Sequence, residues 1–503
     1  MSLLVGATHA LAQEPIACAG EIGGTSAPAS FASDPGLRSA IEMLREWILY
    51  RMEWVGPPGL SVAVTYRGQL VWTEGFGLSN VREDQPASPR TVYGSASLTK
   101  PVTAIAVLQL RDAGRLDLDD PVQRYLPWFE AAENGLVDAG GRPITIRDLL
   151  SHSAGIESDG PGYHWSDFGF PDSDTIRSVL AEGERPFPPG TVFKYSNWGF
   201  HLLGEIIEAV SGQEFARYVS ARVLAPLGMC SSTVEAIPDL SGLAVGYGRA
   251  LPARTTRPVM PFSDVGALRP AAGLFTTAPD LARFMALVSG DMASNRVALD
   301  PASVAEMARL HSTWPDSAGG YGLGLMLPRL PRPLVGHVSR MNGYAAVFFL
   351  DPTTGVGVAA LGNALDAELP PGGRLSVVDR IFEWMTGPIV SAAESREVDP
   401  PFVGFATLAG TFRSLSGDFQ VAVYQDSLVV YDPAHPPGAE RLTRLVPDGR
   451  GWFRASVRGD WVLPAGTRVR FVDPREHSGP TRMVIPGMYA DRLEGKRSPG
   501  RHD

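Results

Sequence analysis

Hydrophobic and polar positions follow each other along the chain in patterns that separate helices from strands. Apolar residues recur at helical spacing from residue 35 onward, and they are Leu37, Ile41, Leu44, Trp47, Ile48 and Met52. Two runs, 60–66 and 69–75, are joined by Arg67-Gly68 and have the alternation and turn residues of a β-hairpin. The chain therefore opens with an amphipathic helix followed by a hairpin.

The segment 115–320 has mostly helical patterns, interrupted by proline and glycine. Its clearest helices are 198–210, ended by Gly212, and 278–288, entered through Thr276-Thr277. Strand patterns return late, at 334–340, 344–350 and 355–361, and a helix at 375–385 follows them. The economical packing is one antiparallel sheet built from both ends of the domain and flanked by helices, with an all-helical domain inserted. This is an α/β (α+β) fold.

A second domain is expected at the C-terminus. Residues 33–387 form the main domain and 388–401 a linker, after which short β-rich runs are separated by Gly, Asp and Pro turns. These runs are 419–423, 427–431, 452–457 and 467–472. Residues 402–495 are therefore predicted to form a small β-barrel or sandwich.

Composition excludes several classes of protein. The chain of 503 residues is long enough for two domains, and its formal charge of −10 argues against nucleic-acid or anionic-membrane partners. No apolar run approaches the roughly 18 residues that span a bilayer. The two cysteines, Cys18 and Cys230, exclude a disulfide framework; they can pair, but buried free thiols are the more common outcome.

The first residues favour export. Residues 3–12 are apolar and end in Ala10-Leu11-Ala12, which is similar to a signal-peptide cleavage site, although the basic start is missing. We interpret 1–32 as a signal-peptide remnant and a disordered lead-in. This predicts a periplasmic or secreted protein, and a cytoplasmic one if the segment is not a signal remnant.

The segment Gly94–Pro101 places a serine one turn before a lysine, at the start of an apolar helical repeat. Pro101 is tolerated only in the first turn of a helix, which puts Ser97 at the helix N-terminus. Free amides and the helix dipole there favour a developing oxyanion. Lys100 lies on the same face and can accept the serine proton. Ser97 is therefore the candidate nucleophile.

A serine and a lysine at this spacing also occur as ordinary helix-start residues, and the pattern alone is common by chance. This chain, however, has only three lysines, Lys100, Lys194 and Lys496, and only Lys100 follows a serine by three residues. Arginine effectively never deprotonates, so a lysine used this sparingly favours proton-transfer chemistry.

Two further motifs carry candidate chemistry. Tyr195-Ser196-Asn197 precedes a helix, and a phenol becomes a base near neutral pH only if positive charge, here from Lys100, lowers its pKa. Asn197 offers an amide to a substrate carbonyl or to Lys100. Alone, the motif is more typical of a core tyrosine and a capping asparagine at the start of a helix. His337 lies on a late predicted strand, where a lone histidine is more often structural.

In this order the three motifs resemble the serine beta-lactamase and penicillin-binding-protein-like family, in its class C, esterase and D-aminopeptidase-like branch. The resemblance covers about residues 35–387 and includes the sequence segments 149–155, 189–190 and 272–277. It implies a beta-lactamase-like fold with its site in the cleft between the sheet and the helical domain. It implies no metal or other cofactor.

The resemblance also implies a role for each motif residue. Ser97 attacks a carbonyl carbon and forms an acyl-enzyme, and Lys100 and Tyr195 share the general-base and general-acid work. Asn197 positions the substrate, and His337 lies opposite and assists the tyrosine or the leaving group.

The strand triplet departs from the family pattern, which usually has a small residue second and glycine third. Here the triplet is His337-Val338-Ser339, so Val338 is expected to narrow the cleft and Ser339 to hinder close approach of substrate. Arg340 either meets a substrate carboxylate or is an exposed strand-end arginine. The oxyanion hole would be the backbone N–H groups of Ser97 and Arg340.

The favoured function is cleavage of an amide or peptide bond in a small molecule or short peptide. Carboxylesterase action on short acyl esters is the alternative, followed by beta-lactam hydrolysis and a non-catalytic penicillin-binding-type sensor. The C-terminal domain resembles the lipocalin-like appendage of some family members, with a role in limiting access to the cleft or in assembly. The sequence leaves the oligomeric state open.

Overall fold

The protein is described from a computed structural model. The structure describes residues 31–493 apart from 32, 55, 130–141, 163, 183–186, 238–239, 252–255, 291–297, 317, 330–331, 371–375, 395–404, 415–416, 426, 450, 457–462, 464, 473–480 and 486–487. The predicted signal remnant, Cys18 and most of the predicted linker therefore lie outside the described residues.

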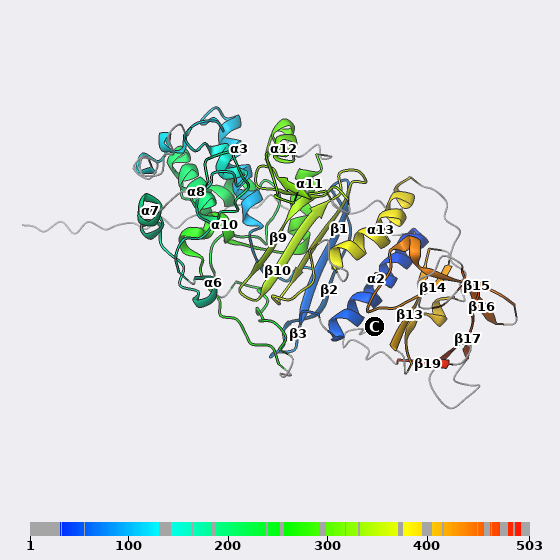
Figure 1. Cartoon of the computed structure of the whole chain (residues 1–503). Helices are drawn as coiled ribbons and strands as arrows, with labels where there is room; N and C mark the ends of the chain where they lie inside the picture. The colour runs from blue at the N-terminus through cyan, green and yellow to red at the C-terminus, as the bar shows by residue number, and fades with distance from the viewer. Residues whose placement is uncertain are drawn as a thin grey trace, which may run out of the picture.

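One large antiparallel sheet forms the centre of the main domain (Figure 1). In the described part of the chain its strand order is β3-β2-β1-β11-β10-β9-β8-β7-β6. The strands are β1 (Gly59–Tyr66), β2 (Gln69–Asn80), β3 (Gln85–Pro86), β6 (Ser312–Thr313), β7 (Gly319–Tyr321), β8 (Met326–Pro328), β9 (Val335–Met341), β10 (Tyr344–Leu350) and β11 (Val356–Gly362). Because β1 pairs with β11, early and late segments join in one sheet, and this prediction is confirmed.

Helices cover both faces of the sheet. They are α2 (Pro35–Trp54), α3 (Thr99–Asp112), α5 (Ile146–Leu150), α6 (His164–Asp167), α7 (Ser173–Glu182), α8 (Asn197–Ser211), α9 (Phe215–Val219), α10 (Arg269–Ala272), α11 (Ala278–Val288), α12 (Pro301–Met307) and α13 (Val377–Ala393). In Figure 1, α2 and α13 lie between the sheet and the C-terminal domain, whereas α3, α8 and α10 belong to the helical domain on the other side. The predicted helical insertion is confirmed.

The alternation of side chains along each strand divides the interior into two cores. On β10, Ala346 and Phe348 pack into the core shared with α3, α8 and α11. Val347 and Phe349 point to the opposite face and pack into the core shared with α2 and α13. The sheet thus separates the helical domain from the α2/α13 layer.

The C-terminal domain is a closed barrel, as predicted. Its strands, in order around the described barrel, are β12 (Gly410–Ser414), β13 (Gly417–Tyr424), β14 (Ser427–Tyr431), β15 (Thr443–Pro447), β16 (Trp452–Ala455), β17 (Arg468–Val472), β18 (Arg482–Ile485) and β19 (Met488–Arg492). Apolar side chains such as Phe412, Leu428 and Phe453 pack together inside it. The barrel rests on the α2/α13 layer, where Tyr424 and Tyr431 join that core.

Two details differ from the sequence expectations. The helix predicted over 375–385 continues through Pro388 to Ala393, beyond the residue at which the sequence predicts the linker to begin. Cys230 is exposed and disulfide-bonded, so the expectation of a buried free thiol is wrong for this residue. None of the helices in the described residues is both long and apolar enough to cross a bilayer.

Candidate active site

Ser97 lies where a short strand turns into a helix. The strand β4 (Tyr93–Ala96) pairs with β5 (Leu274–Thr276), and α3 begins at Thr99 with Pro101 in its first turn. Ala96 has a φ of +28°, a backbone conformation that non-glycine residues rarely adopt and that is found at functional sites. Within the described residues the backbone N–H of Ser97 has no hydrogen-bond acceptor. The turn therefore presents both a hydroxyl and a free amide.

Lys100 is completely buried one turn into α3. Its Nζ donates to Ser97 Oγ at 3.1 Å, to Asn197 Oδ1 at 2.7 Å and to the carbonyl oxygen of Ala271 at 3.0 Å. Burial lowers the pKa of Lys100 to about 7, against the opposing charge of Asp159. A substantial fraction of this amine is therefore neutral at neutral pH.

Tyr195 approaches Ser97 from the other side. Its hydroxyl donates to Ser97 Oγ at 2.9 Å, and Lys100 Nζ lies 4.7 Å from the centre of its ring. Burial raises the pKa of Tyr195 above its usual range, and the Asp159 charge raises it further. The expectation that Lys100 lowers this pKa has no support here, because desolvation of the phenolate is the largest influence and raises the pKa, despite the opposing hydrogen bond with Ser97. The phenol is a proton donor here.

Asn197 is the first residue of α8 and is oriented by two charged groups. Its Oδ1 accepts from Lys100, and its Nδ2 donates to Asp159 Oδ1 at 2.7 Å. Of the two partners expected from the sequence, the structure shows Lys100. Asp159 was not anticipated, because it lies in a loop without periodicity and its contact with Asn197 is long-range.

His337 is buried on β9, and both of its ring nitrogens have partners. Its Nε2 lies 2.8 Å from the Tyr321 hydroxyl and its Nδ1 2.7 Å from the carbonyl oxygen of Val338. Burial and the Lys100 charge lower the pKa of His337 to about 3. Within the described residues it makes no hydrogen bond to Tyr195 or Ser97. The structure therefore places it next to Tyr321.

The residues after His337 alternate across the sheet. Val338 packs against the core shared with α2 and α13, so the expectation that it narrows the cleft is wrong. Ser339 is buried, and its side chain shares the face of His337. Arg340 shares the face of Val338; its side chain is exposed and has no ion pair within the described residues. The expected meeting of this side chain with a substrate carboxylate has no support in this geometry.

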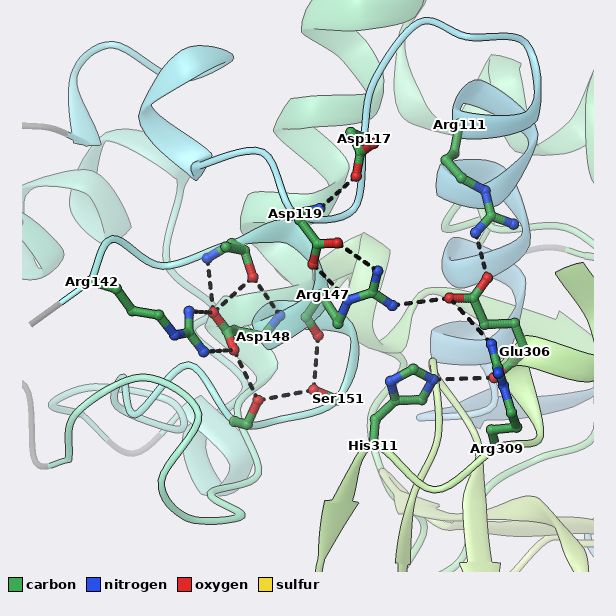
Figure 2. Close-up of polar contacts among 12 residues, drawn as sticks. Arg111, Asp117, Asp119, Arg142, Arg147, Asp148, Ser151, Glu306, Arg309 and His311 are labelled. Atoms are coloured by element: carbon green, nitrogen blue, oxygen red, sulfur yellow. Dashed lines mark hydrogen bonds and ion pairs between the residues drawn. The ribbon is translucent and has the colours of Figure 1, made fainter.

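A polar network around α5 anchors the turn that follows this helix (Figure 2). Arg142 makes a bidentate ion pair with Asp148, with distances of 2.6 and 2.8 Å, and Asp148 accepts from Ser153 Oγ at 3.2 Å. Next to it, Glu306 joins Arg111 and Arg147. These contacts hold the turn that follows α5. From the sequence, this turn is recognised only as part of the segment 149–155 that resembles the family.

Comparison with known proteins gives the family. A profile described as "Beta-lactamase" matches residues 44–375. The chain is 28% identical over 328 residues to "Protein flp" of Staphylococcus aureus strain N315, a match that covers 62% of this chain and 61% of the relative. The chain thus spans about three fifths of the length of that relative.

Solved structures show the same fold. The octameric penicillin-binding protein homologue from Pyrococcus abyssi has a TM-score of 0.58 and 23% identity, and the match covers 90% of this chain and 99% of that chain. EstCE1, described as a hydrolase with promiscuous acyltransferase activity, has a TM-score of 0.57 and 22% identity, with coverages of 69% and 99%. Because the profile covers most of the chain, this protein belongs to the beta-lactamase family, whose members are serine hydrolases.

Proposed function

We propose that this protein is a serine hydrolase that cleaves an amide or peptide bond of a small or linear peptide through an acyl-enzyme on Ser97. The observation that carries the proposal is the buried Lys100 amine 3.1 Å from Ser97 Oγ, with its pKa lowered to about 7. Such an amine is a base at neutral pH, which an ordinary lysine is not.

In the proposed first step, neutral Lys100 takes the proton of the Ser97 hydroxyl as Oγ bonds to the substrate carbonyl carbon. The carbonyl π electrons move to oxygen, and the free backbone N–H of Ser97 is available to that oxyanion. The backbone N–H of Arg340 remains the proposed second donor. Lys100 now carries the proton and the positive charge.

Collapse of this intermediate breaks the carbon–nitrogen bond. An amine is a poor leaving group unless it is protonated, and Tyr195, a neutral phenol 2.9 Å from Ser97 Oγ, is placed to donate that proton. The proton on Lys100 then restores the phenol. Water hydrolyses the acyl-enzyme by the reverse sequence and regenerates Ser97.

The same acyl-enzyme serves a carboxylesterase, which stays the second candidate because alkoxides leave without prior protonation. The presence of a protonated donor at Tyr195 favours the amide. Beta-lactam hydrolysis and a non-catalytic sensor rank lower, and the same experiment distinguishes all four.

The test is intact-protein mass spectrometry after incubation with a fluorophosphonate, followed by a panel of peptides, p-nitrophenyl esters and a chromogenic cephalosporin. Wild type should gain one label and Ser97→Ala none, with an unchanged melting temperature. Ser95→Ala is the matched control, because that hydroxyl is buried and donates to the Tyr93 carbonyl oxygen. Labelling of Ser97→Ala, or near-wild-type turnover by it, would refute the nucleophile assignment.

We also propose export to the periplasm or medium. The support is the apolar start with its Ala10-Leu11-Ala12 site, together with disulfide-bonded Cys230, since disulfides persist in oxidising compartments. Cell fractionation with N-terminal sequencing tests it. Intact protein retained in the cytoplasm would contradict it.

A further inference from the structure

His152 lies in the turn after α5 and is buried next to the ring of Tyr195. Its φ of +55° is unusual for a non-glycine residue. The turn is fixed from both sides, since Ser151 Oγ lies 2.9 Å from Ser153 Oγ and Ser153 Oγ donates to Asp148. Figure 2 shows this anchoring around Asp148 and Ser151. The backbone therefore holds this side chain in one place.

His152 holds the segment that carries Tyr195 and Asn197 by three contacts. Its carbonyl oxygen accepts from the backbone N–H of Lys194 at 2.7 Å. Its Nδ1 accepts from the backbone N–H of Ser196 at 3.1 Å. Its ring lies 4.2 Å, centre to centre, from the ring of Tyr195. The two residues on either side of Ser196 are the ones that contact Ser97 and Lys100.

The hydrogen bond from Ser196 fixes the state of the imidazole. Nδ1 must keep its lone pair to accept, so the ring proton sits on Nε2. Nε2 is buried and has no hydrogen-bond partner within the described residues. Burial, reinforced by the charges of Lys100 and His337, holds the pKa of His152 well below its usual value. The ring therefore stays neutral and remains an acceptor.

Packing alone does not require a histidine at this position. The ring is surrounded by Phe193, Phe200 and Tyr321, at 5.9, 5.2 and 4.5 Å, an environment that would accept another aromatic side chain. What a phenylalanine lacks is the acceptor for the Ser196 N–H, and a buried N–H without an acceptor is unfavourable.

We propose that His152 is a positioning residue for acyl transfer: its Nδ1 fixes the peptide at Ser196 and thereby holds the Tyr195 hydroxyl on Ser97 and the Asn197 amide on Lys100. The inference rests on the proposed function, because it assigns to His152 the placement of that site's proton donor. His152 belongs to the helical domain and makes no contact of its own with Ser97. The proposal adds it to the residues that set the acylation rate.

The first experiment separates the acceptor from the ring. His152→Phe keeps an aromatic side chain and removes the acceptor; His152→Asn removes the ring and keeps an acceptor at the same place, since Oδ1 and Nδ1 are both bonded to Cγ. We expect His152→Phe to slow the p-nitrophenyl acetate burst by about 10–10²-fold, the cost of a small misplacement of a reacting group. His152→Asn should recover most of that loss. Equal rates for the two variants would overturn the proposal.

The second experiment tests whether His152 acts through its neighbours. We expect Tyr195→Phe alone to slow acylation, and His152→Phe to cost less in that background than in wild type, because one of the two groups that it displaces is already gone. If the double variant slowed acylation by the product of the two single-variant factors, His152 would act independently of Tyr195. That result would overturn the proposal.

Phe193→Leu is the matched packing control. It disturbs the same aromatic cluster, 5.9 Å from both His152 and Tyr321, without removing the acceptor, so its burst rate should match wild type. If His152→Phe and Phe193→Leu lower the melting temperature alike and neither slows the burst of folded protein, His152 is only structural. Fluorophosphonate labelling of the wild-type protein distinguishes failure of this inference from failure of the proposed function. If Ser97 is not labelled, the proposed function is refuted, whatever the His152 variants do.

Discussion

At the scale of single residues, burial decides what the candidate groups can do. Lys100 and Tyr195 are both removed from water, and burial disfavours the charged form of each, so more of the amine is in its neutral, proton-accepting form and the phenol keeps its proton. At neutral pH an exposed lysine at the same position would be almost fully protonated, whereas an exposed tyrosine would be a neutral phenol, as Tyr195 is.

The first prediction concerns how the acylation rate depends on pH below pH 7. Lys100 accepts a proton only when neutral, and it is neutral above its pKa of about 7. The acylation rate should therefore rise about tenfold per pH unit below pH 7 and level off above it, measured as the p-nitrophenyl acetate burst by stopped flow.

The matched control is Lys194→Arg, since the Lys194 ammonium is 3.5 Å from Glu157 and makes no contact with Ser97. Its profile should coincide with that of wild type. A burst rate independent of pH between 5.5 and 7 would remove Lys100 as the base.

At the scale of helices and strands, local chemistry predicts most boundaries. The turn at Arg67-Gly68 has φ values of +45° and +73°, as its hairpin geometry requires. Gly212 ends α8 in the left-handed conformation, and Thr277 caps α11. The exception is α13, which continues past Pro388 because burial of Ile389 and Ala392 in the α2/α13 core outweighs the lost backbone hydrogen bond.

The second prediction tests a helix cap. Thr277 Oγ1 accepts from the backbone N–H of Asp280 at 3.3 Å, so Thr277→Ala should lower the free energy of unfolding by about 0.5–2 kcal/mol. Urea unfolding followed by circular dichroism measures it, with exposed Thr313→Ala on β6 as the control. Identical midpoints for the two variants would show that the cap adds no stability.

At the scale of the whole molecule, the barrel and the candidate site lie on opposite sides of the sheet (Figure 1). The barrel is held to the α2/α13 layer by Arg380, which donates to the carbonyl oxygens of Pro436 and Pro437, and by Trp47, which donates to that of Pro433. The expected role in limiting access to the cleft has no support in this arrangement. The barrel instead covers the apolar outer face of two helices.

The third prediction concerns this interface. Trp384 is fully buried, its ring lies 5.2 Å from that of Tyr431, and its Nε1 donates to the Pro437 carbonyl oxygen. Trp384→Ala should lower the free energy of unfolding by about 3–5 kcal/mol, measured by chemical denaturation. Fluorophosphonate labelling of the folded fraction should stay at the wild-type rate, because the sheet separates Trp384 from Ser97.

Val446→Ala on the barrel, where the side chain is 54% exposed, is the control and should change stability little. If both variants lowered the free energy of unfolding by similar amounts, the interface between the barrel and the α2/α13 layer would make no special contribution to stability. A slower labelling rate in Trp384→Ala would mean that the two sides of the sheet are coupled.

The amino-acid sequence by itself determined the order and type of the elements, the single sheet from two distant segments, the barrel and the motif residues Ser97, Lys100, Tyr195 and Asn197. The elements follow from periodicity and turn chemistry, which are local along the chain, and the motif residues follow from the order of the motifs in the sequence. Only the tertiary structure decided the protonation states, the partners of His337 and Asn197, the direction of Val338 and the placement of His152. Those depend on burial and on contacts between distant segments, such as that of Lys100 with Asn197, which no local pattern encodes.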